Sequence, residues 1–244
     1  MSSHDVSPAV ESSANAQLLS LASHELRTPL SVLTGYLRML QQQDNGTLGE
    51  LQRKMIAEAQ KSCERLTALV GELSDMSKLE TGAAVMRNEP VDLFETLEAV
   101  AASVDEGRDR DVHLAFTGES SGATLVGDPV RLRAAFAAIF RAVLREQPGA
   151  CTVVVYRQLS RNADTPVATV VVAHEAQSQR ARQSPPARFN EYRGGLGLLL
   201  PIARSVIARH GGRIWSPADA DAASAIAVSL PLEKAQAQFP ELKH

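Results

Sequence analysis

Apolar side chains in the first third of the chain recur every three or four residues, the spacing that places them on one face of an α-helix. In a first segment, which ends near Gln43, these positions are Leu26, Leu30, Leu33, Leu37 and Leu40. A second segment repeats the pattern at Leu48, Leu51, Met55, Leu66, Leu69, Val70, Leu73 and Met76. The pattern predicts two long helices in an antiparallel hairpin. A lone hairpin cannot bury apolar faces this extensive against itself, so we expect dimerisation into a four-helix bundle.

Turn-forming residues indicate where these helices begin and end. Residues 1–13 are rich in Ser, Ala and Pro without periodicity and predict a disordered leader. The turn at Asp44–Thr47 should place Thr47 as the N-cap of the second helix, with Glu50 completing a capping box. Gly82 should end that helix. We therefore assign residues 14–84 to the hairpin.

From Val91 onward, short apolar runs alternate with helical segments. Helices are predicted at residues 91–105, 129–146 and 196–210, and strands at 112–117, 124–126, 151–158, 167–174, 213–216 and 225–230. Asp128 should cap the middle helix, with Pro129 at its first position. This order predicts an α/β sandwich over residues 91–234, with helices on one face of a mixed sheet. The fold class is α+β.

Composition and charge exclude several function classes. The net charge of −3 gives no basic footprint for nucleic acid. No uncharged apolar run approaches the ~20 residues of a membrane span, and Met1–Gln17 lacks the features of a signal peptide. Cys63 and Cys151 form no disulfide framework and fit a reducing cytoplasm. We therefore expect a soluble, cytoplasmic protein. We also expect no metal site, because four histidines show no metal-ligand spacing: His4, His113, His210 and His244.

Three polar residues on the first helix form the strongest candidate for chemistry. At ~100° per residue, His24 lies about 180–200° around the axis from the stripe that contains Leu26, so its ring should face solvent. Glu25 can orient the imidazole or take its proton while the other nitrogen attacks an electrophile. Thr28 follows one turn later on the same face, and Pro29 should bend the helix beside it. Taken without their neighbours, these residues also fit an ordinary bundle surface.

The full string around His24 resembles a known motif. S-H-E-L-R-T-P-L at residues 23–30 is similar to the phosphoacceptor box of the two-component sensor histidine kinases, and S-D-M-S-K-L-E-T-G at 74–82 resembles the end of that family's dimerisation and phosphotransfer hairpin. The resemblance implies that His24 is phosphorylated, that Glu25 is its acid/base partner, and that Thr28 positions water when a response regulator is dephosphorylated.

The second half of the chain resembles the ATP-binding domain of the same family, which has the Bergerat (GHKL) fold. The similarity lies in G-D-P-V-R-L-R at residues 127–133 and in the glycine-rich box and helix at 194–215. By this resemblance, Gly195 and Gly197 belong to the nucleotide site. Arg145 stands where relatives contact phosphates with a basic residue, although a solvated helix-face arginine is equally consistent.

Several positions of this nucleotide site depart from the family pattern. Ala142 stands where relatives carry the magnesium-binding asparagine, and Ala138 replaces another usual asparagine; a methyl group cannot ligate a hard cation. His174 replaces the aspartate that accepts a hydrogen bond from adenine, and no glycines follow it. Leu199 replaces the third glycine of the box, where a side chain obstructs the phosphates. We therefore expect no cofactor, with ATP and Mg²⁺ bound only if the altered site remains competent.

The family's mobile lid should lie at Gln177–Arg193, but this segment contains no lid motif. Its four arginines fit either a solvated loop or a surface for an acidic partner: Arg180, Arg182, Arg188 and Arg193.

These features predict a homodimeric member of the family in which His24 exchanges phosphoryl groups with the aspartate of a response-regulator receiver domain, hydrolyses that aspartyl phosphate, or receives phosphate from another kinase. The ATP-binding domain would keep its fold without nucleotide chemistry. Two alternatives stay open: an active ATP-dependent autophosphorylating kinase, and a non-enzymatic scaffold that dimerises with another histidine kinase and inhibits it. Which of these holds decides whether the chain is an enzyme.

Overall fold

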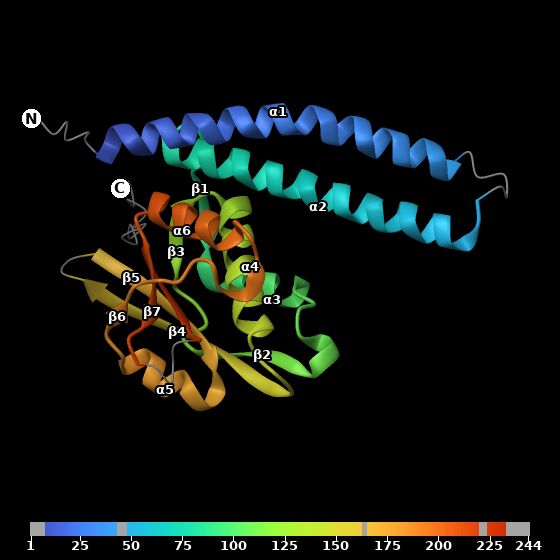
Figure 1. The fold of residues 1–244 in the computed structure, drawn as a ribbon. Coiled ribbons are helices and arrows are strands. Elements are labelled where there is room, and N and C mark those ends of the chain that lie inside the picture. Colours follow the sequence, from blue (N-terminus) through green and yellow to red (C-terminus); the bar gives the residue numbers. More distant parts are fainter. Residues whose placement is uncertain (1–7, 43–47, 163–164, 220–223, 233–244) are drawn as a thin grey trace, which may run out of the picture. The chain divides into compact units, whose positions relative to one another are not determined.

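A computed structural model describes residues 8–42, 48–162, 165–219 and 224–232 (Figure 1). For residues 8–22, 24, 25 and 162 the description covers the helix or strand but not the side chain. The chain divides into two compact units, Met1–Val85 and Met86–His244. Each unit is described by itself. No helix among the described residues combines the length and the apolar character needed to span a bilayer.

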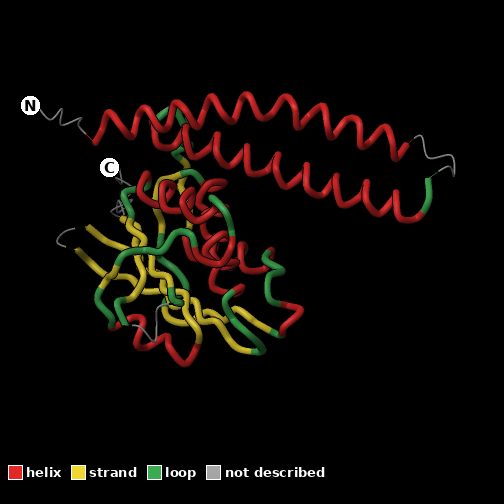
Figure 2. The backbone as a smooth tube through the Cα atoms, in the orientation of Figure 1, coloured by secondary structure: helices red, strands yellow, loops and turns green. Residues whose placement is uncertain are grey.

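The first unit is a hairpin of two long helices, α1 (Pro8–Gln42) and α2 (Glu50–Thr81), which run side by side in opposite directions (Figure 2). Helix α2 ends at Gly82, whose φ of 79° is left-handed, and this confirms the predicted stop. The predicted cap at its start is wrong: Thr47 lies outside the described residues, and the helix begins after Gly49. The side chain of Gln52 reaches back to accept the Gly49 N–H at 2.9 Å, which replaces the expected Thr47–Glu50 box.

The disordered leader predicted for residues 1–13 is too long, because α1 already begins at Pro8. Proline is favourable at the first helical position, where its missing N–H would have no partner, and Ala9 and Glu11 favour helix in the turn that follows. Residues 1–7 lie outside the described part of the chain.

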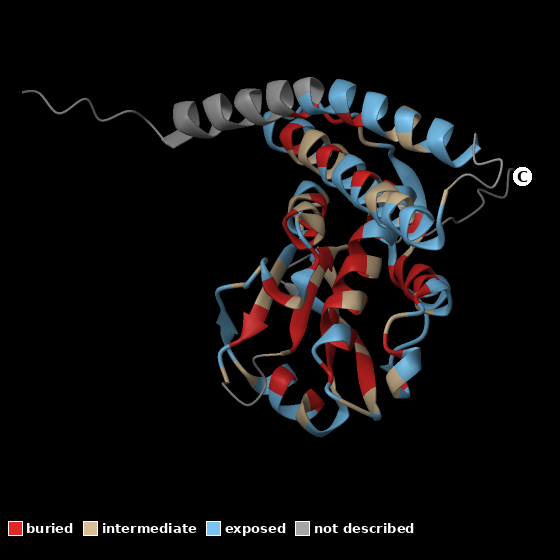
Figure 3. Ribbon diagram, turned by 45° about the vertical axis from the view of Figure 1, so that its right-hand side comes forward, coloured by how far each residue is buried: buried red, intermediate tan, exposed pale blue. Residues whose placement is uncertain are grey.

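The hairpin buries only one edge of its apolar stripe. Leu30 is buried and Leu37 half-buried, whereas Leu26, Leu33 and Leu40 keep 49%, 52% and 49% of their surface exposed. Further large apolar side chains are exposed along both helices (Figure 3): Val32, Tyr36, Met39, Leu51, Met55, Leu66 and Leu69. The described side chains therefore leave a long apolar surface for which the hairpin itself supplies no cover.

The second unit is built on a six-stranded mixed sheet of order β2-β4-β5-β8-β7-β6. Strands β2 and β4 are parallel, and the other neighbours are antiparallel. The strands are β2 (Val112–Gly118), β4 (Cys151–Asn162), β5 (Thr165–His174), β6 (Pro186–Ala187), β7 (Arg213–Pro217) and β8 (Ile226–Pro231). A separate antiparallel pair joins β1 (Glu89–Asp92) to β3 (Thr124–Gly127). Helical hairpin and mixed sheet together confirm the α+β class predicted from the sequence.

Three helices, α3 (Leu93–Ser103), α4 (Pro129–Arg145) and α6 (Leu199–Arg209), pack as one layer against the sheet (Figure 1). Fully buried side chains from all three fill the core: Phe94, Leu97, Leu132, Phe136, Ile139, Phe140, Leu200 and Ile207. The large apolar residues of this layer, shown buried in Figure 3, hold α4 in the middle of the unit.

Helix α4 begins as predicted. The Asp128 carboxylate accepts the N–H groups of Val130 and Arg131 at 3.1 and 3.0 Å, with Pro129 at the first position. Burial raises the pKa of Asp128, but these backbone donors and the N–H of Arg87 outweigh burial and lower the pKa below its ordinary value. The carboxylate is therefore charged as it caps the helix.

Helix α3 starts later than predicted. Val91 lies in β1 rather than in the helix, because the Asp92 side chain accepts the N–H groups of Phe94 and Glu95 and so caps the helix after it. The N-cap residue itself has an extended backbone, which allows Val91 to pair with Leu125 of β3.

A fourth helix, α5 (Glu175–Gln183), lies where the sequence predicted a polar loop. Its Ala181 is buried with apolar residues of β5, of β8 and of the position just before β8: Val171, Ala173, Ala225 and Ala227. Tyr156 and Trp215 pack against this cluster. Since side chains alternate along a strand, this row faces away from Val170 and Val172, which are buried on the other face. The expectation of helices on one face alone is therefore incomplete.

Arg157 of β4 carries a charge into the core between two aromatic rings. Its guanidinium lies 5.3 Å from the Phe94 ring centroid and 4.9 Å from that of Phe116, and Nη1 donates to Glu98 at 2.6 Å. The Arg157 side chain is 5% exposed, and among the described residues its Nε has no hydrogen-bond partner. The group is held by stacking and one ion pair.

Replacing Arg157 by alanine should lower the free energy of unfolding of the second unit by about 3 kcal/mol, because it removes two stacking contacts and leaves a cavity. Trp215 is the only tryptophan of the chain and lies in this unit, so its fluorescence during urea unfolding measures the change. Gln158→Ala, at an exposed neighbouring position, should cost less than about 0.5 kcal/mol. Equal stability of the two variants would contradict the assigned role of Arg157.

Candidate phosphotransfer and nucleotide sites

One continuous helix, α1, carries His24, Glu25 and Thr28. Thr28 is exposed. The predicted outward direction of the His24 ring lies outside the described side chains, as does that of Glu25. Helical spacing of four residues nevertheless places positions 24 and 28 on one face, one turn apart.

Pro29 lies inside α1 and shapes the backbone beside these residues. It has no N–H, so the carbonyl of Glu25, four residues earlier, receives no helical hydrogen bond. In the next turn, the hydroxyls of Ser31 and Thr34 each donate to the carbonyl four residues earlier, both at 2.8 Å. The candidate phosphoacceptor therefore sits where the helical hydrogen-bond ladder is interrupted.

In the second unit, the position of the missing metal-binding asparagine is covered by a neighbouring segment. Ala138 and Ala142 of α4 are buried, and Gly194 packs directly on Ala142. A Cβ atom built on Gly194 would lie 3.1 Å from the Ala142 Cα and 3.4 Å from its Cβ. Besides supplying no oxygen ligand, position 142 therefore has the backbone of Gly194 where a longer side chain would extend.

His174, the residue in place of the adenine-binding aspartate, caps a helix. Its Nδ1 accepts the N–H of Ala176 at 3.1 Å, and α5 starts at the next residue. The ring nitrogen that accepts this bond is occupied by the protein's own backbone. Strand β5 therefore continues directly into helix α5, whereas in the family pattern the aspartate is followed by glycines.

The glycine-rich box forms a short 3₁₀ turn, Arg193–Gly195, ahead of α6. Gly194, Gly195 and Gly197 have φ of 69°, 61° and 61°, a left-handed conformation that favours glycine. Leu199, in place of the third glycine, is half-buried and lines a groove between α3 and α4 together with Ala138. Part of the box thus keeps a glycine-specific backbone, while its end is covered by an apolar side chain.

Arg145 and Gly195, two of the predicted cofactor-binding residues, lie together. Arg145 Nη1 donates to the Gly195 carbonyl at 3.4 Å, and its Nε pairs with Glu106 at 3.0 Å. A phosphate group at Arg145 would have to compete with the Glu106 carboxylate for the guanidinium.

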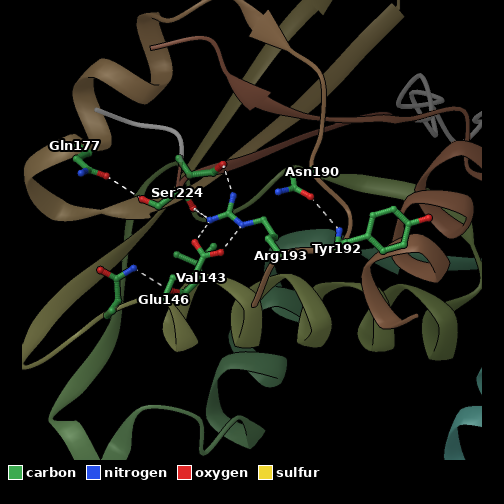
Figure 4. A network of polar contacts seen from close by, with 9 residues as sticks. Val143, Glu146, Gln177, Asn190, Tyr192, Arg193 and Ser224 are labelled. Atoms are coloured by element: carbon green, nitrogen blue, oxygen red, sulfur yellow. Dashed lines mark hydrogen bonds and ion pairs between the residues drawn. The ribbon is translucent and has the colours of Figure 1, made fainter. Parts of the chain in front are cut away.

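The sequence pattern does not predict the central role of Arg193. Its side chain is 5% exposed and forms a two-point ion pair with Glu146, at 2.9 Å between Nε and Oε1 and through a second contact between Nη2 and Oε2 (Figure 4). Nη2 also donates to the Ser224 carbonyl, and Nη1 to that of Ala225 at 3.3 Å. The Ser224 hydroxyl in turn donates to Gln177 of α5 at 3.0 Å. No sequence spacing connects positions 146 and 193, so no local signal marked the pair.

The other arginines of this segment do not form a common basic surface. Arg180 pairs with Asp219 at 3.2 Å, and the Arg182 guanidinium stacks 4.1 Å from the Tyr156 ring centroid. With Arg193 buried, Arg188 is the exposed member that has neither of these contacts. The geometry therefore gives no support to a collective site for an acidic partner.

The remaining histidine and cysteine residues of interest have structural surroundings. His210 Nε2 accepts the Asp128 N–H at 2.9 Å, and its Nδ1 donates to the Val206 carbonyl at 2.7 Å. Cys63 is buried and Cys151 is half-buried, and neither forms a disulfide. Burial raises the pKa of the Cys151 thiol, and this effect outweighs the lowering effect of Arg110. Within the described ranges, no three His, Cys, Asp or Glu residues are grouped to hold a metal.

Sequence comparisons match both units of the chain to known histidine kinases. The His Kinase A (phospho-acceptor) domain family matches residues 14–82. The chain is 30% identical over 222 residues to the signal transduction histidine-protein kinase BaeS of Escherichia coli K12, covering 87% of this chain and 46% of that protein. It is 26% identical over 227 residues to the circadian input-output histidine kinase CikA of Synechococcus elongatus, covering 89% and 30%. The chain thus spans less than half the length of these curated relatives.

Two solved structures share the fold. The crystal structure of full-length ShkA in complex with AMPPNP superposes with a TM-score of 0.66 at 20% identity, covering 88% of this chain and 45% of that one. The Acinetobacter baumannii histidine kinase AdeS gives a TM-score of 0.54 at 17% identity, covering 86% and 98%. At these identities the comparison establishes the fold.

Proposed function

The chain belongs to the two-component sensor histidine kinase family, and from this premise we propose that His24 exchanges phosphoryl groups with a response regulator while the second unit has lost nucleotide binding. The observation that carries the proposal is the complete set of His24, Glu25 and Thr28 on α1, inside the matched phosphoacceptor domain. The partner would be the receiver domain of the regulator, with its phosphorylated aspartate as the donor.

In the transfer reaction, one imidazole nitrogen of His24 attacks the phosphorus of the aspartyl phosphate. A nitrogen–phosphorus bond forms, the phosphorus–oxygen bond to the aspartate breaks, and the aspartate leaves as a carboxylate. Glu25 orients the ring and takes the proton of its second nitrogen. In the hydrolytic branch, water held by the Thr28 hydroxyl attacks the same phosphorus. Transfer from another kinase to His24 uses the same nucleophile.

Three features of the second unit support the loss of nucleotide chemistry. Ala142 offers no oxygen for a hard cation and is covered by Gly194. His174 caps α5 with its ring nitrogen. Arg145, the basic residue predicted to contact phosphates, is paired with Glu106. Each feature removes a different contact: the metal ligand, the adenine acceptor and the phosphate cation.

An active kinase remains the second candidate because Gly195 and Gly197 keep their left-handed backbone and Arg145 lies against Gly195. This candidate predicts label from radioactive ATP on His24 of the purified protein. A scaffold that dimerises with another kinase is favoured by the exposed apolar surface of the hairpin, and predicts that His24→Ala keeps full biological activity.

Calorimetric titration of ATP into the full chain should give no saturable heat up to about 1 mM, with or without Mg²⁺, because metal ligand and adenine acceptor are both missing. An authentic histidine kinase titrated under the same conditions provides the positive control. Saturable, Mg²⁺-dependent binding in the micromolar range would contradict nucleotide loss and favour the active kinase.

The phosphotransfer half of the proposal is tested directly with a receiver domain phosphorylated on its aspartate. Mixed with the full chain, it should lose its phosphoryl group, which appears either on the protein or as inorganic phosphate. A phosphorylated receiver whose lifetime is unchanged by the protein, tested across the regulators of the same cell, would overturn this half.

A further inference from the structure

We propose that Arg193 and Glu146 exclude nucleotide from the second unit by filling the space between α4 and the start of β8 with a permanent internal ion pair. This inference rests on the proposed loss of nucleotide binding and assigns residues to it. It assigns residues of the chain itself to the space beside Ala142 and Gly194.

The location of the pair follows from its neighbours. Glu146 directly follows α4 and lies about one helical turn beyond Ala142, the position of the missing metal ligand. On the other side, the Ser224 carbonyl accepts from Arg193, while the Ser224 hydroxyl contacts Gln177, three residues after His174 (Figure 4). The guanidinium therefore bridges the two sides on which relatives carry the metal ligand and the adenine acceptor.

The Arg193 guanidinium is well satisfied in this place. All three of its nitrogens donate, either to the Glu146 carboxylate or to the carbonyls of Ser224 and Ala225. The two contacts to Glu146 form the two-point geometry that suits a guanidinium and a carboxylate. A ligand entering here would break this set and leave a buried charge without its partner, which is strongly unfavourable.

Removal of the arginine would not by itself create a phosphate site. The Glu146 carboxylate would then face the entering triphosphate, and like charges repel. Arg193 also immediately precedes Gly194, so its fixed position holds the glycine-rich turn against Ala142. The pair thus acts in two ways, because it occupies the space and it keeps the turn closed on α4.

Hydrogen-exchange mass spectrometry of the full chain tests this arrangement in wild type, Arg193→Gln and Glu146→Gln. Peptides covering residues 188–198 and 224–228 should exchange at least about tenfold faster in Arg193→Gln, because local opening no longer breaks the ion pair. Arg188→Gln, an exposed arginine in the same segment, should match wild type. The double variant Arg193→Gln/Glu146→Gln should exchange at a rate close to that of Arg193→Gln alone, because both substitutions remove the same ion pair. Its rate should not exceed the rate expected if the two single substitutions acted independently.

The outcomes separate this inference from the proposed function. If Arg193→Gln exchanges like wild type, the ion pair does not close the site and the inference falls, while nucleotide loss stands on the calorimetric result. If ATP with Mg²⁺ slows exchange of these peptides in wild type, nucleotide enters the space and both proposals fail. Should Arg193→Gln not fold, as judged by Trp215 fluorescence, Glu146→Gln supplies the same test because its amide keeps one acceptor oxygen.

Discussion

Replacing His24 by alanine should reduce phosphoryl exchange with a phosphorylated receiver domain to the uncatalysed rate, a loss of at least about 100-fold, because the substitution removes the only nucleophile of the proposed transfer. The measurement follows ³²P from the receiver aspartate onto the protein, and free phosphate is counted separately because water is the nucleophile of the hydrolytic branch. α1 should be unaffected, because alanine is the strongest helix former, and far-ultraviolet circular dichroism verifies this.

One further variant separates transfer from hydrolysis, and a second serves as its control. Thr28→Ala should retain phosphohistidine formation but slow the release of inorganic phosphate, because it removes the hydroxyl proposed to hold water. His113→Ala provides a matched control: this exposed histidine in the second unit contacts Asp111 at 2.6 Å and has no part in the proposed chemistry. Full exchange activity in His24→Ala would refute the phosphoacceptor assignment.

A charge on the exposed apolar stripe of α1 should disrupt the proposed homodimer. Leu33→Glu places a carboxylate at a position that is 52% exposed in the single hairpin and that we expect to be buried between hairpins. In a twofold-symmetric dimer the substitution occurs twice. Burying two unpaired charges should weaken the dimer by about 3 kcal/mol or more, equivalent to a dissociation constant about 100-fold larger.

Sedimentation equilibrium measures this constant for the full chain. Gln42→Glu serves as the control, since this exposed residue of α1 lies off the apolar stripe and receives the same charge. Its dissociation constant should stay within about threefold of wild type. A Leu33→Glu protein that remains as dimeric as wild type would exclude this face from the interface, and a monomeric wild type would exclude the homodimer altogether.

The elements that the sequence predicted well are those whose ends are set by local chemistry. Asp128 and Pro129 fix the start of α4, and Gly82 fixes the end of α2; each acts within a few residues of its own position. Apart from β6, which was not predicted, the strands of the main sheet followed from runs of β-branched residues, such as Val170–Val172 in β5. Boundaries shifted where a neighbouring polar residue offered a better cap, as Asp92 does for α3.

Helix α5 was missed because its buried face is made of small residues. Only Ser178 and Ala181 are buried on it, so the segment has almost no hydrophobic periodicity to detect. The Arg193–Glu146 pair was missed for another reason: its partners are 47 residues apart and meet only through the tertiary fold. The sequence did locate the altered positions Ala142, His174 and Leu199, but it contained no sign of the ion pair.

Helix α5 is tied down along its length: His174 caps its start, Arg180 pairs with Asp219, and the Ser184 hydroxyl that follows its end accepts the Asp219 N–H at 2.9 Å. An ATP-dependent kinase needs a lid that opens and closes over the nucleotide in every catalytic cycle. In this protein the corresponding segment forms helix α5, which these contacts hold in place. In the proposed function, the second unit therefore contributes a fixed fold rather than a cycle of lid motion.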